Sequence, residues 1–417
     1  MTTRFLLLTA AVATLTTASP ASAASQSILF VGNSYTFGRL DPVMSYNAGN
    51  VHDLTAAFQA ANATGTNAWE PHPWGGVPGI FKQFTVQAGL DYDVSISARN
   101  AASLRGQFLN TANSAWDLRG NVAWKNWGTV VLQEQSDAAL PAGFGKNANL
   151  ATFNAYADQF ERFIHNGAAQ NYTESQLFGS QAACTATGLS AASCNTVRTI
   201  GQNVNANPAT RVFLTQTWAR PDMVYAHKIT TPDTTSVDGR PIVDTSAAGG
   251  NATLYYGNLA AMTQDLHNAF YAKAASNPGF AGVIPAGDAF QRALDAGLVK
   301  TGGFYNASGT YTTPLPGDAM NLWWDDYLHA SKYGSYLDAL VQFGAVTGFD
   351  PALLGGAEIA ARDLGINAAD ALTLQRVASA QLGFTAPVPE PAAWALFVGG
   401  LALLAARRAA SAGSATR

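Results

Sequence analysis

The sequence predicts an α/β protein in which helices pack on both faces of a mostly parallel sheet. Two observations lead to this prediction. Short apolar runs of strand length recur along the chain, and segments with the apolar period of an amphipathic helix lie between them. This alternation is typical of βαβ units, which build parallel sheets.

The first expected strand covers 28–31, where four apolar residues in a row precede a glycine. Such a run suits a parallel strand that is buried on both faces. Further strands are expected at 94–98, 129–133, 212–216 and 282–285. Loops are expected at 38–76 and 217–250, and the Ala/Leu-rich segment 351–384 is expected to form a terminal helical element.

Two long helices are predicted from apolar stripes that should face the sheet. Their apolar positions are Phe153, Tyr156, Phe160 and Phe163, and Leu259, Met262, Leu266 and Phe270. Stripes with this period are mostly packing surfaces rather than cofactor sites.

The composition limits which classes of protein this chain can belong to. The chain has 417 residues, of which 12% are charged, and its formal net charge is -4. This leaves little basic surface, so no nucleic-acid partner is expected. Cys184 and Cys194 are the two cysteines, and their spacing matches neither a redox pair nor a zinc pattern, so a disulfide is expected and no metal.

Both ends of the chain carry patterns of processing signals. Segment 1–23 has Arg4, an apolar stretch at 5–14 and a small-residue cleavage site at 21–23, and is therefore expected to be a signal peptide for export. Segment 385–417 begins with a Pro-rich linker, continues with an apolar run at 392–406 and ends after Arg407 and Arg408. That run is shorter than the roughly 20 residues that span a bilayer comfortably.

Ser34 is the candidate nucleophile. It follows the first expected strand in the turn Gly32-Asn33-Ser34, at the edge of the sheet where ligands bind in open α/β proteins. The alternative is an ordinary strand-to-helix turn in which Asn33 or Ser34 caps the next segment.

A serine nucleophile needs a base and a group that orients the base. Asp326 and His329 lie three residues apart and can share one face of a turn or helix. His329 would then take the serine proton, and Asp326 would hold the other ring nitrogen. Asp325 is the alternative orienting carboxylate, and a helix-surface pair is the alternative reading of both residues.

The two motifs together resemble the SGNH hydrolase superfamily, also called GDSL-like esterases, over residues 27–350. The first motif of that superfamily matches Gly32, Asn33 and Ser34, and its Asp-x-x-His motif matches Asp326 and His329. The resemblance implies a three-layer α/β/α sandwich with a five-stranded flavodoxin-like sheet. It also implies carboxylic ester hydrolysis through an acyl-enzyme, with no cofactor.

The resemblance further implies an oxyanion hole, and here the sequence departs from the family pattern. The N–H of Ser34 would be one donor. The family's second motif supplies a glycine N–H, but no glycine stands at 98–103, and Ala101 is the best match. The third motif is replaced by 133–136, Gln-Glu-Gln-Ser, where the amide of Gln135 or Gln133 is expected to complete the hole.

The tail resembles the PEP-CTERM sorting signal of Gram-negative bacteria, because Pro-Glu-Pro at 389–391, the run at 392–406 and the terminal arginines occur in that order. The resemblance implies transient insertion of 392–406 in the inner membrane and recognition by an exosortase-type enzyme. A plain C-terminal membrane anchor is the alternative. Either reading places the mature protein in the periplasm, at the cell surface or in the extracellular matrix.

Together these patterns predict an exported esterase, with acylated cell-surface or extracellular polysaccharide as a plausible substrate. Tryptophans near the expected site would stack on sugar rings or pack in the core. They are Trp69, Trp74, Trp124, Trp127, Trp218, Trp323 and Trp324. The competing hypothesis is a catalytically decayed protein of the same fold that binds glycan or belongs to the matrix.

Overall fold

The computed structural model describes residues 25–61, 72–111, 116–225, 254–303, 319–324 and 326–384. Its centre is a sheet of six strands in the order β2-β3-β1-β4-β7-β8, and every neighbouring pair is parallel. The strands are β1 (Gln26–Gly32), β2 (His52–Asp53), β3 (Tyr92–Ala98), β4 (Thr129–Gln133), β7 (Arg211–Thr215) and β8 (Phe280–Ile284).

The predicted α/β class with a mostly parallel sheet is confirmed. Without β2, the strands follow the flavodoxin-like order in which the first strand lies between the second and the third. The predicted number of five strands is wrong. The sixth strand, β2, has two residues and pairs with the edge of β3 inside the segment that was expected to be a loop. A strand this short has no periodic pattern that the sequence could reveal.

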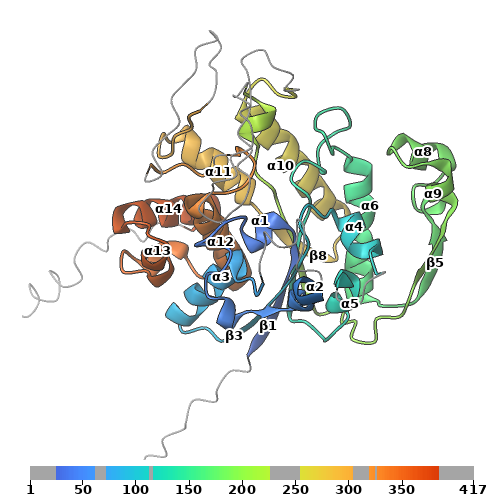
Figure 1. Ribbon diagram of the computed structural model, residues 1–417, viewed down its shortest axis with the longest axis horizontal. Helices are drawn as coiled ribbons and strands as arrows, with labels where there is room; N and C mark the ends of the chain where they lie inside the picture. Colours follow the sequence, from blue (N-terminus) through green and yellow to red (C-terminus); the bar gives the residue numbers. More distant parts are fainter. Residues whose placement is uncertain are drawn as a thin grey trace, which may run out of the picture.

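Helices cover both faces of the sheet (Figure 1). On one face lie α3 (Gly76–Gln87) and α12 (Lys332–Thr347), which pack against each other. The other face carries α4 (Leu104–Leu109), α6 (Leu150–His165) and α10 (Leu259–Ser276). The apolar stripes of α6 and α10 are buried as predicted, and the rings of Phe153 and Phe270 lie 4.8 Å apart between these two helices.

Shorter elements complete the described chain. They are α1 (Ser34–Phe37), η1 (Ala48–Asn50), α2 (Ala56–Ala61), α5 (Leu118–Val122), η4 (Pro221–Met223), α11 (Ala286–Asp295), η5 (Pro351–Leu354), α13 (Ile359–Asp363) and α14 (Ala368–Gln381). Segment 351–384 is therefore largely helical. It packs on α12, where the amide of Gln375 donates hydrogen bonds to the hydroxyl of Tyr336 and to the carbonyl of Gly355.

Residues 170–200 form a separate arm beside α6, drawn in green in Figure 1. Its base is an antiparallel pair of strands, β5 (Gln170–Thr173) and β6 (Val197–Ile200). Three short helices lie between them, α7 (Glu174–Leu177), α8 (Gln181–Ala186) and α9 (Ala191–Asn195). The predicted disulfide between Cys184 and Cys194 is confirmed and joins α8 to α9.

A buried carboxylate anchors the base of the arm to the domain. The side chain of Glu174 has no exposed surface and pairs with Arg105 on α4 at 2.6 and 2.7 Å. It also pairs with Arg198 on β6 and accepts a hydrogen bond from Tyr156 on α6, both at 2.6 Å. These contacts with Arg105, Arg198 and Tyr156 hold the pKa of Glu174 near 2, although burial alone would raise it.

Several sequence-based expectations fall outside the described residues. They concern the signal segment 1–23, the tail 385–417 with its apolar run, Trp69, and parts of both expected loops. Among the helices of the described chain, none is long and apolar enough to cross a membrane.

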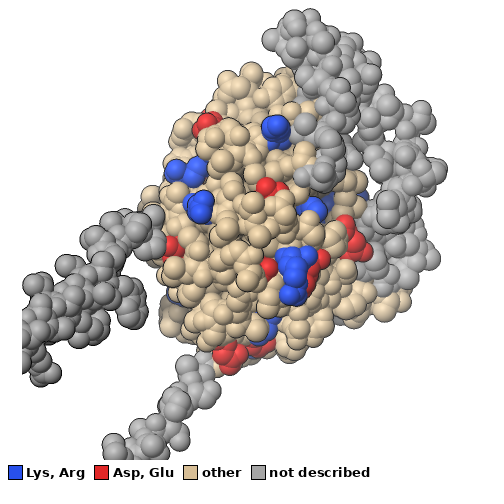
Figure 2. Space-filling model, turned by 90° about the vertical axis from the view of Figure 1, so that its left-hand side faces the viewer, with Lys and Arg blue, Asp and Glu red and all other residues tan. Residues whose placement is uncertain are grey.

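Figure 2 shows one face of the molecule, on which charged side chains are few and scattered among uncharged residues. No basic patch gathers on the described part of this face. The low content of charged residues in the sequence therefore produces a mostly neutral surface here rather than one concentrated region of charge.

Candidate active site

The site lies at the edge of the sheet where the parallel strands end. Ser34 follows β1, Ala101 follows β3, Gln135 follows β4 and Trp218 follows β7. Because Gly32 at the end of β1 pairs in register with Ala98 at the end of β3, the segments that follow them start side by side. The carboxyl ends of parallel strands share one edge, so residues from distant parts of the sequence meet there.

The Gly32-Asn33-Ser34 turn is held by hydrogen bonds to both neighbouring strands. Asn33 caps α1, with its Oδ1 accepting from the N–H of Tyr35 at 3.1 Å. Its Nδ2 donates to the carbonyls of Ala102 at 3.1 Å and Glu134 at 3.2 Å. A Cβ at position 32 would overlap the hydroxyl of Thr36, so the turn requires glycine there. The same three-residue turn thus caps α1 and places Ser34 at the edge of the sheet.

Three side chains form a continuous relay at this edge. Nδ1 of His329 lies 2.5 Å from Oδ2 of Asp326, and Nε2 of His329 lies 2.8 Å from Oγ of Ser34. Ser34 is 6% exposed and His329 8% exposed, so the hydrogen bonds are shielded from bulk water. This is the arrangement of nucleophile, base and orienting carboxylate that activates a serine.

Asp326 lies next to the ring of His329 and is held in place by the backbone of its own turn. Its Oδ1 accepts hydrogen bonds from the N–H groups of Leu328 at 3.0 Å and His329 at 2.9 Å. Burial alone would raise the pKa of Asp326, but the charge and hydrogen bond of His329, with those two N–H groups, lower it below its ordinary value. Asp325, the alternative carboxylate, lies outside the described residues.

Asp326 and His329 lie in a tight turn and not on a helix. Tyr327, between them, has a φ of +58°, and α12 begins only at Lys332. The alternative reading as a helix-surface pair is therefore wrong. The turn folds the backbone back on itself and so brings the two side chains together. The spacing of the two residues in the sequence could not reveal this turn.

Two aromatic side chains fix this turn, and the sequence analysis did not identify either role. The hydroxyl of Tyr35 donates to the carbonyl of Leu328 at 3.0 Å, and the indole N–H of Trp218 donates to the same carbonyl at 3.1 Å. The two rings stack 3.9 Å apart, and Trp218 stacks in turn on Phe290. The sequence indicated the role of Tyr35 only through its place directly after Ser34.

The tryptophans are mostly core residues rather than a rim of exposed rings. Trp74, Trp127, Trp218 and Trp323 are each at most 2% exposed, whereas Trp124 is 57% exposed. The indole N–H groups of Trp127, Trp218 and Trp323 donate to backbone carbonyls, whereas the buried N–H of Trp74 has no partner in the described chain. The described tryptophans therefore do not support a rim of exposed indoles on which sugars would stack.

A cavity of about 210 Å³, called here the catalytic cavity, opens at the relay. Its lining includes Ser34, His329, Ala101 and Gln135. Within the described chain, the N–H groups of Ser34 and Ala101 donate to no other protein group. Two free N–H groups at one small cavity are suited to hold a negatively charged oxygen.

Ala101 adopts the left-handed backbone region, with a φ of +55°. Glycine enters this region without strain, whereas alanine adopts it at some cost. The alanine keeps the same N–H group, so the departure from the motif does not remove the donor. Hydrogen bonds to Asn33 and Arg99 hold the next residue, Ala102, in place.

The two candidate glutamines have different surroundings. Gln133 is buried, and its side chain contacts the N–H of Asn33, the hydroxyl of Thr36 and the carbonyl of Glu134. It does not line the catalytic cavity. Gln135 does line it and donates one amide hydrogen bond to the hydroxyl of Ser136 at 3.1 Å. The second N–H of that amide has no described protein acceptor.

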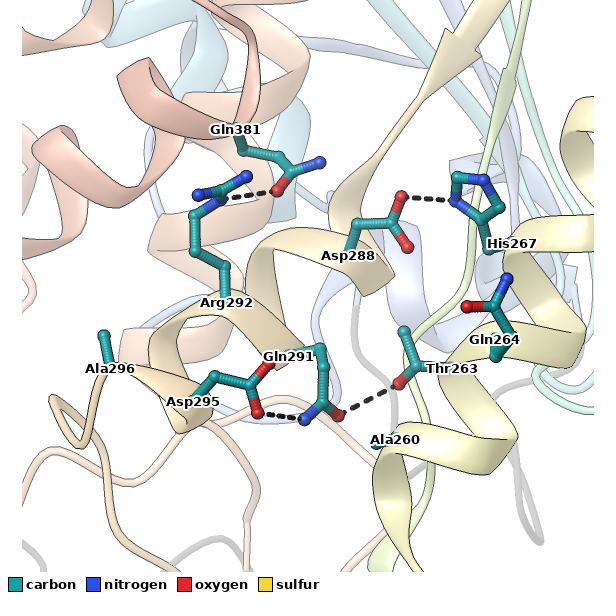
Figure 3. Close-up of a pocket in the computed structure, with 10 residues that line it drawn as sticks. All are labelled: Ala260, Thr263, Gln264, His267, Asp288, Gln291, Arg292, Asp295, Ala296 and Gln381. Atoms are coloured by element: carbon teal, nitrogen blue, oxygen red, sulfur yellow. Dashed lines mark hydrogen bonds and ion pairs between the residues drawn. The ribbon is translucent and has the colours of Figure 1, made fainter.

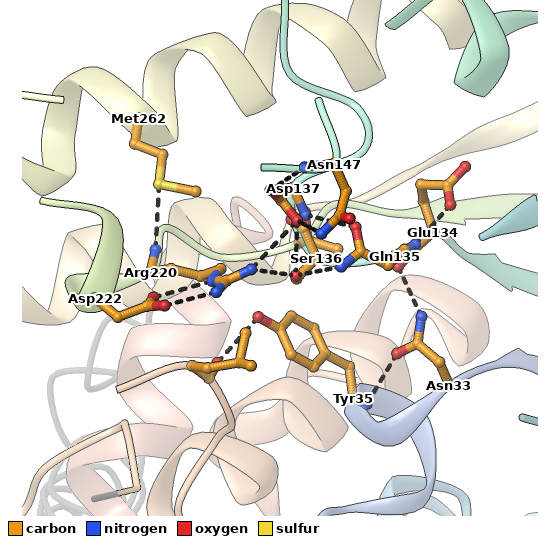
Figure 4. Close-up of polar contacts among 12 residues, drawn as sticks. Asn33, Tyr35, Glu134, Gln135, Ser136, Asp137, Asn147, Arg220, Asp222 and Met262 are labelled. Carbon is orange, nitrogen blue, oxygen red and sulfur yellow. Dashed lines mark hydrogen bonds and ion pairs between the residues drawn. The ribbon is translucent and has the colours of Figure 1, made fainter. Parts of the chain in front are cut away.

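Behind Gln135 lies a buried ionic network that the sequence did not indicate (Figure 4). Arg220 donates to the hydroxyl of Ser136 at 2.9 Å and pairs with Asp137 at 3.2 Å. Its guanidinium also binds both oxygens of Asp222, at 3.0 and 2.6 Å. The network joins the loop after β4 to the loop after β7 and so fixes one wall of the catalytic cavity.

The other described histidines contact carboxylates but no serine hydroxyl. His52 pairs with Asp93, His72 with Asp53, His165 with Glu161 and His267 with Asp288. His227 lies outside the described residues. In the described part of the chain, no group of three or more His, Cys, Asp or Glu side chains could hold a metal ion.

A larger cavity of about 680 Å³ lies between α10 and α11, where His267 and Asp288 face each other (Figure 3). Its polar side chains bind one another. Gln291 bridges Thr263 and Asp295, and Arg292 binds Gln381. The cavity contains no relay to a nucleophile, so the chemistry of the site belongs to the edge of the sheet.

Searches with family models and among curated protein sequences each found no match. Solved structures with a similar fold were found. A DUF4886 family protein from Bacteroides uniformis is 11% identical, with a TM-score of 0.38, over 86% of this chain and 95% of its own. A carbohydrate esterase family 2 enzyme with a carbohydrate-binding domain, from Corynascus thermopiles (Myceliophthora fergusii), is 13% identical, with a TM-score of 0.33, over 80% of this chain and 69% of its own.

Est24, a carbohydrate acetylesterase from Sinorhizobium meliloti, is 10% identical, with a TM-score of 0.27, over 77% of this chain and 99% of its own. Identities this low say nothing about activity. The function is therefore inferred from the geometry of the site itself.

Proposed function

We propose that the protein is an exported serine hydrolase of the SGNH type that cleaves carboxylic esters through an acyl-enzyme. The observation that carries this proposal is the relay from Asp326 through His329 to Ser34, with contacts of 2.5 and 2.8 Å. A hydroxyl within hydrogen-bond reach of an oriented imidazole is the requirement for nucleophilic catalysis by serine.

In the proposed first step, Oγ of Ser34 bonds to the ester carbonyl carbon while its proton passes to Nε2 of His329. The carbonyl oxygen becomes negatively charged and is held by the N–H groups of Ser34 and Ala101 and the amide of Gln135. The bond to the alcohol then breaks, and His329 gives its proton to the departing oxygen. The acyl group remains as an ester of Ser34.

In the second step, a water molecule gives one proton to His329, and its oxygen bonds to the acyl carbon. Collapse of the second oxyanion returns the proton to Oγ of Ser34 and releases the carboxylic acid. Throughout both steps, the low pKa of Asp326 keeps this carboxylate ionised and able to stabilise the protonated imidazole.

The proposed substrate is an acylated polysaccharide at the cell surface or in the extracellular matrix. Two features support the location of this substrate outside the cytoplasm: the disulfide between Cys184 and Cys194, which suits an oxidising compartment, and the signal pattern at 1–23. The tail at 385–417 would direct the protein to an exosortase-type enzyme through transient membrane insertion of 392–406. Deletion of 385–417 in the native host, followed by fractionation, should then release the protein from the cell surface into the medium.

The decisive experiment uses 4-nitrophenyl acetate and a fluorophosphonate probe with the purified protein. We expect turnover of the ester and labelling at Ser34, both abolished by Ser34→Ala and strongly slowed by His329→Ala. Ser276→Ala, at an exposed serine near the end of α10, is the matched control and should behave as wild type. Neither turnover nor labelling in the wild type would contradict the proposal. Glycan binding that persists in Ser34→Ala, without wild-type turnover, would instead support the decayed glycan-binding protein.

A further inference from the structure

A second cavity of about 280 Å³, called here the side cavity, adjoins the catalytic cavity. The two cavities share Ala101 and Gln135 in their linings. The side cavity continues past them to Thr152 and Phe153 on α6 and to Leu189 at the tip of the arm. It therefore lies beside the proposed oxyanion hole and on the path from the relay toward the arm.

The chemistry of ester cleavage decides which half of the substrate this cavity can receive. The departing alcohol must take a proton from Nε2 of His329, so it leaves on the side of that ring. His329 lines the catalytic cavity but not the side cavity. The side cavity lies instead beyond Ala101 and Gln135, and this position suits the acyl half, which stays bound to Ser34 after the alcohol has left.

The lining of the side cavity is polar, and its one described cation already has an anionic partner. Arg105 is its only described cation, and Glu174 already pairs with that guanidinium at 2.6 and 2.7 Å. A carboxylate-bearing acyl group would have to compete with Glu174 for Arg105 and would lie beside the carboxyl of Glu134, which also lines the cavity. The lining favours a neutral acyl group with its own hydrogen-bonding atoms.

Thr152 provides a buried polar atom that has no partner in the described chain. This residue is 8% exposed, and its Oγ1 makes no hydrogen bond to any residue that the structure describes. Its own N–H is already used, donating to Oδ1 of Asn149 at 3.2 Å. A buried hydroxyl without a partner destabilises the protein, so a ligand that binds it gains affinity.

The arm closes the side cavity from outside. Leu189 lies between α8 and α9, inside the loop that the disulfide closes. The tip is held against α6 because the amide of Asn149 donates to the carbonyl of Thr187 at 2.7 Å. Leu189 and Phe153 thus supply apolar walls around a polar interior, and the arm limits the length of a ligand.

On this basis we propose that the side cavity is the acyl-binding subsite and selects acyl chains of about four carbons that carry a hydroxyl group. This inference rests on the proposed esterase function and deepens it. The catalytic cavity alone would hold an acetyl group, whereas a hydroxyacyl chain would extend past Ala101 and place its hydroxyl near Thr152.

The test varies only the acyl group, using 4-nitrophenyl acetate, butyrate and 3-hydroxybutyrate. The wild type should have a higher kcat/KM for 3-hydroxybutyrate than for butyrate. Thr152→Val keeps the shape of the side chain and removes the hydroxyl, so it should lower the ratio of kcat/KM for 3-hydroxybutyrate to kcat/KM for butyrate about five-fold. Thr185→Val, at an exposed threonine of the arm, is the matched control and should change none of the three.

Leu189→Trp tests the wall of the cavity independently of Thr152. The larger side chain should fill the side cavity and lower kcat/KM for both four-carbon esters at least ten-fold relative to kcat/KM for acetate. Two outcomes would overturn the acyl-subsite inference while the esterase function stands. In one, both variants lower kcat/KM equally for all three esters. In the other, the wild type prefers butyrate to 3-hydroxybutyrate. A wild type that does not hydrolyse acetate contradicts the esterase function, and the inference falls with it.

Discussion

The residue where the chain departs most clearly from the family motif is Ala101. Its φ of +55° places an L-residue in a region that glycine occupies freely. The strained residue is followed by a fixed one: the N–H of Ala102 donates to the carbonyl of Arg99, and the carbonyl of Ala102 accepts from the side-chain amide of Asn33. The N–H of Ala101 remains directed by this frame, which is what an oxyanion donor requires.

Ala101→Gly should therefore raise the free energy of unfolding by about 0.5–1 kcal/mol, because relief of the strained φ exceeds the added entropy of the unfolded chain. Esterase activity should stay within a few-fold of wild type because the N–H is retained. Urea unfolding measures the change. Ala102→Gly is the matched control without a positive φ and should destabilise. A loss of stability in Ala101→Gly would contradict the strain argument.

Asp326→Asn tests the role of the orienting carboxylate. The Asn oxygen can still accept from the N–H groups of Leu328 and His329, so the turn should keep its fold. Its amide would donate to Nδ1 of His329 and force the tautomer that cannot accept the proton of Ser34. We expect kcat to fall about 10⁴-fold. Steady-state kinetics measure this, and an unchanged thermal midpoint verifies the fold; activity within ten-fold of wild type would contradict the assignment.

Among the elements, the arm differs most from the minimal α/β repeat. It is joined to the domain by the buried Glu174 at its base and by the contact between Asn149 and Thr187 at its tip. The disulfide lies at the tip and joins two cysteines that are separated by 10 positions in the sequence. The arm therefore has two attachment points, and the disulfide restricts the conformations of the segment between α8 and α9.

Removal of the disulfide should loosen the tip while the sheet stays folded. For a loop of this length, the loss of chain constraint corresponds to about 2–3 kcal/mol. Cys184→Ser with Cys194→Ser should therefore speed amide hydrogen exchange within 181–195 much more than within β1 or β4. Reduction of the wild type with dithiothreitol is the parallel measurement. Equal acceleration in the arm and in the sheet would show that the disulfide stabilises the whole domain instead.

At the scale of the whole molecule, burial of carboxyl groups sets the response to pH. Asp338 on α12 is 2% exposed, and its Oδ1 accepts one hydrogen bond, from the amide of Gln342 at 2.8 Å. Burial raises the pKa of Asp338 to about 7, outweighing that hydrogen bond, which lowers it. Burial likewise raises the pKa of Glu134 to about 7, against hydrogen bonds from the N–H groups of Gln135 and Leu104.

The sign of the pH effect follows from proton binding. Between the unfolded pKa near 4 and the folded pKa near 7, the folded state holds a proton on Asp338 that the unfolded state has lost. The free energy of unfolding should therefore fall as pH rises through this window, by about 2–4 kcal/mol for this group. Above pH 7 the contribution is fully lost.

Asp338→Asn should remove this part of the pH dependence. The variant should match the wild type near pH 4 and be more stable than it at pH 8, because the amide is neutral at both values. Denaturant unfolding at a series of pH values measures the difference. Asp91→Asn, at an exposed position, controls for the loss of one carboxyl group. A variant less stable than wild type at pH 8 would contradict the prediction.

The sequence predicted the fold class and five strands of the sheet because a buried parallel strand needs an uninterrupted apolar run, as in 28–31 and 129–133. It missed β2 and the antiparallel strands of the arm, since strands of two to four residues carry no periodic signal. Ser34, Asp326 and His329 could be proposed because each belongs to a short local motif with its own chemistry.

What the sequence by itself determined was local: the turn at Gly32, the spacing of Asp326 and His329, and the pair of cysteines. Only the tertiary structure decided which side chains meet. The strand order places the ends of β1, β3 and β4 side by side, so it brings Ala101 and Gln135 to Ser34 and excludes Gln133, whose side chain turns into the core. The physical reason is that contacts between strand ends depend on sheet order, and sheet order minimises exposed apolar surface over the whole chain rather than over any one segment.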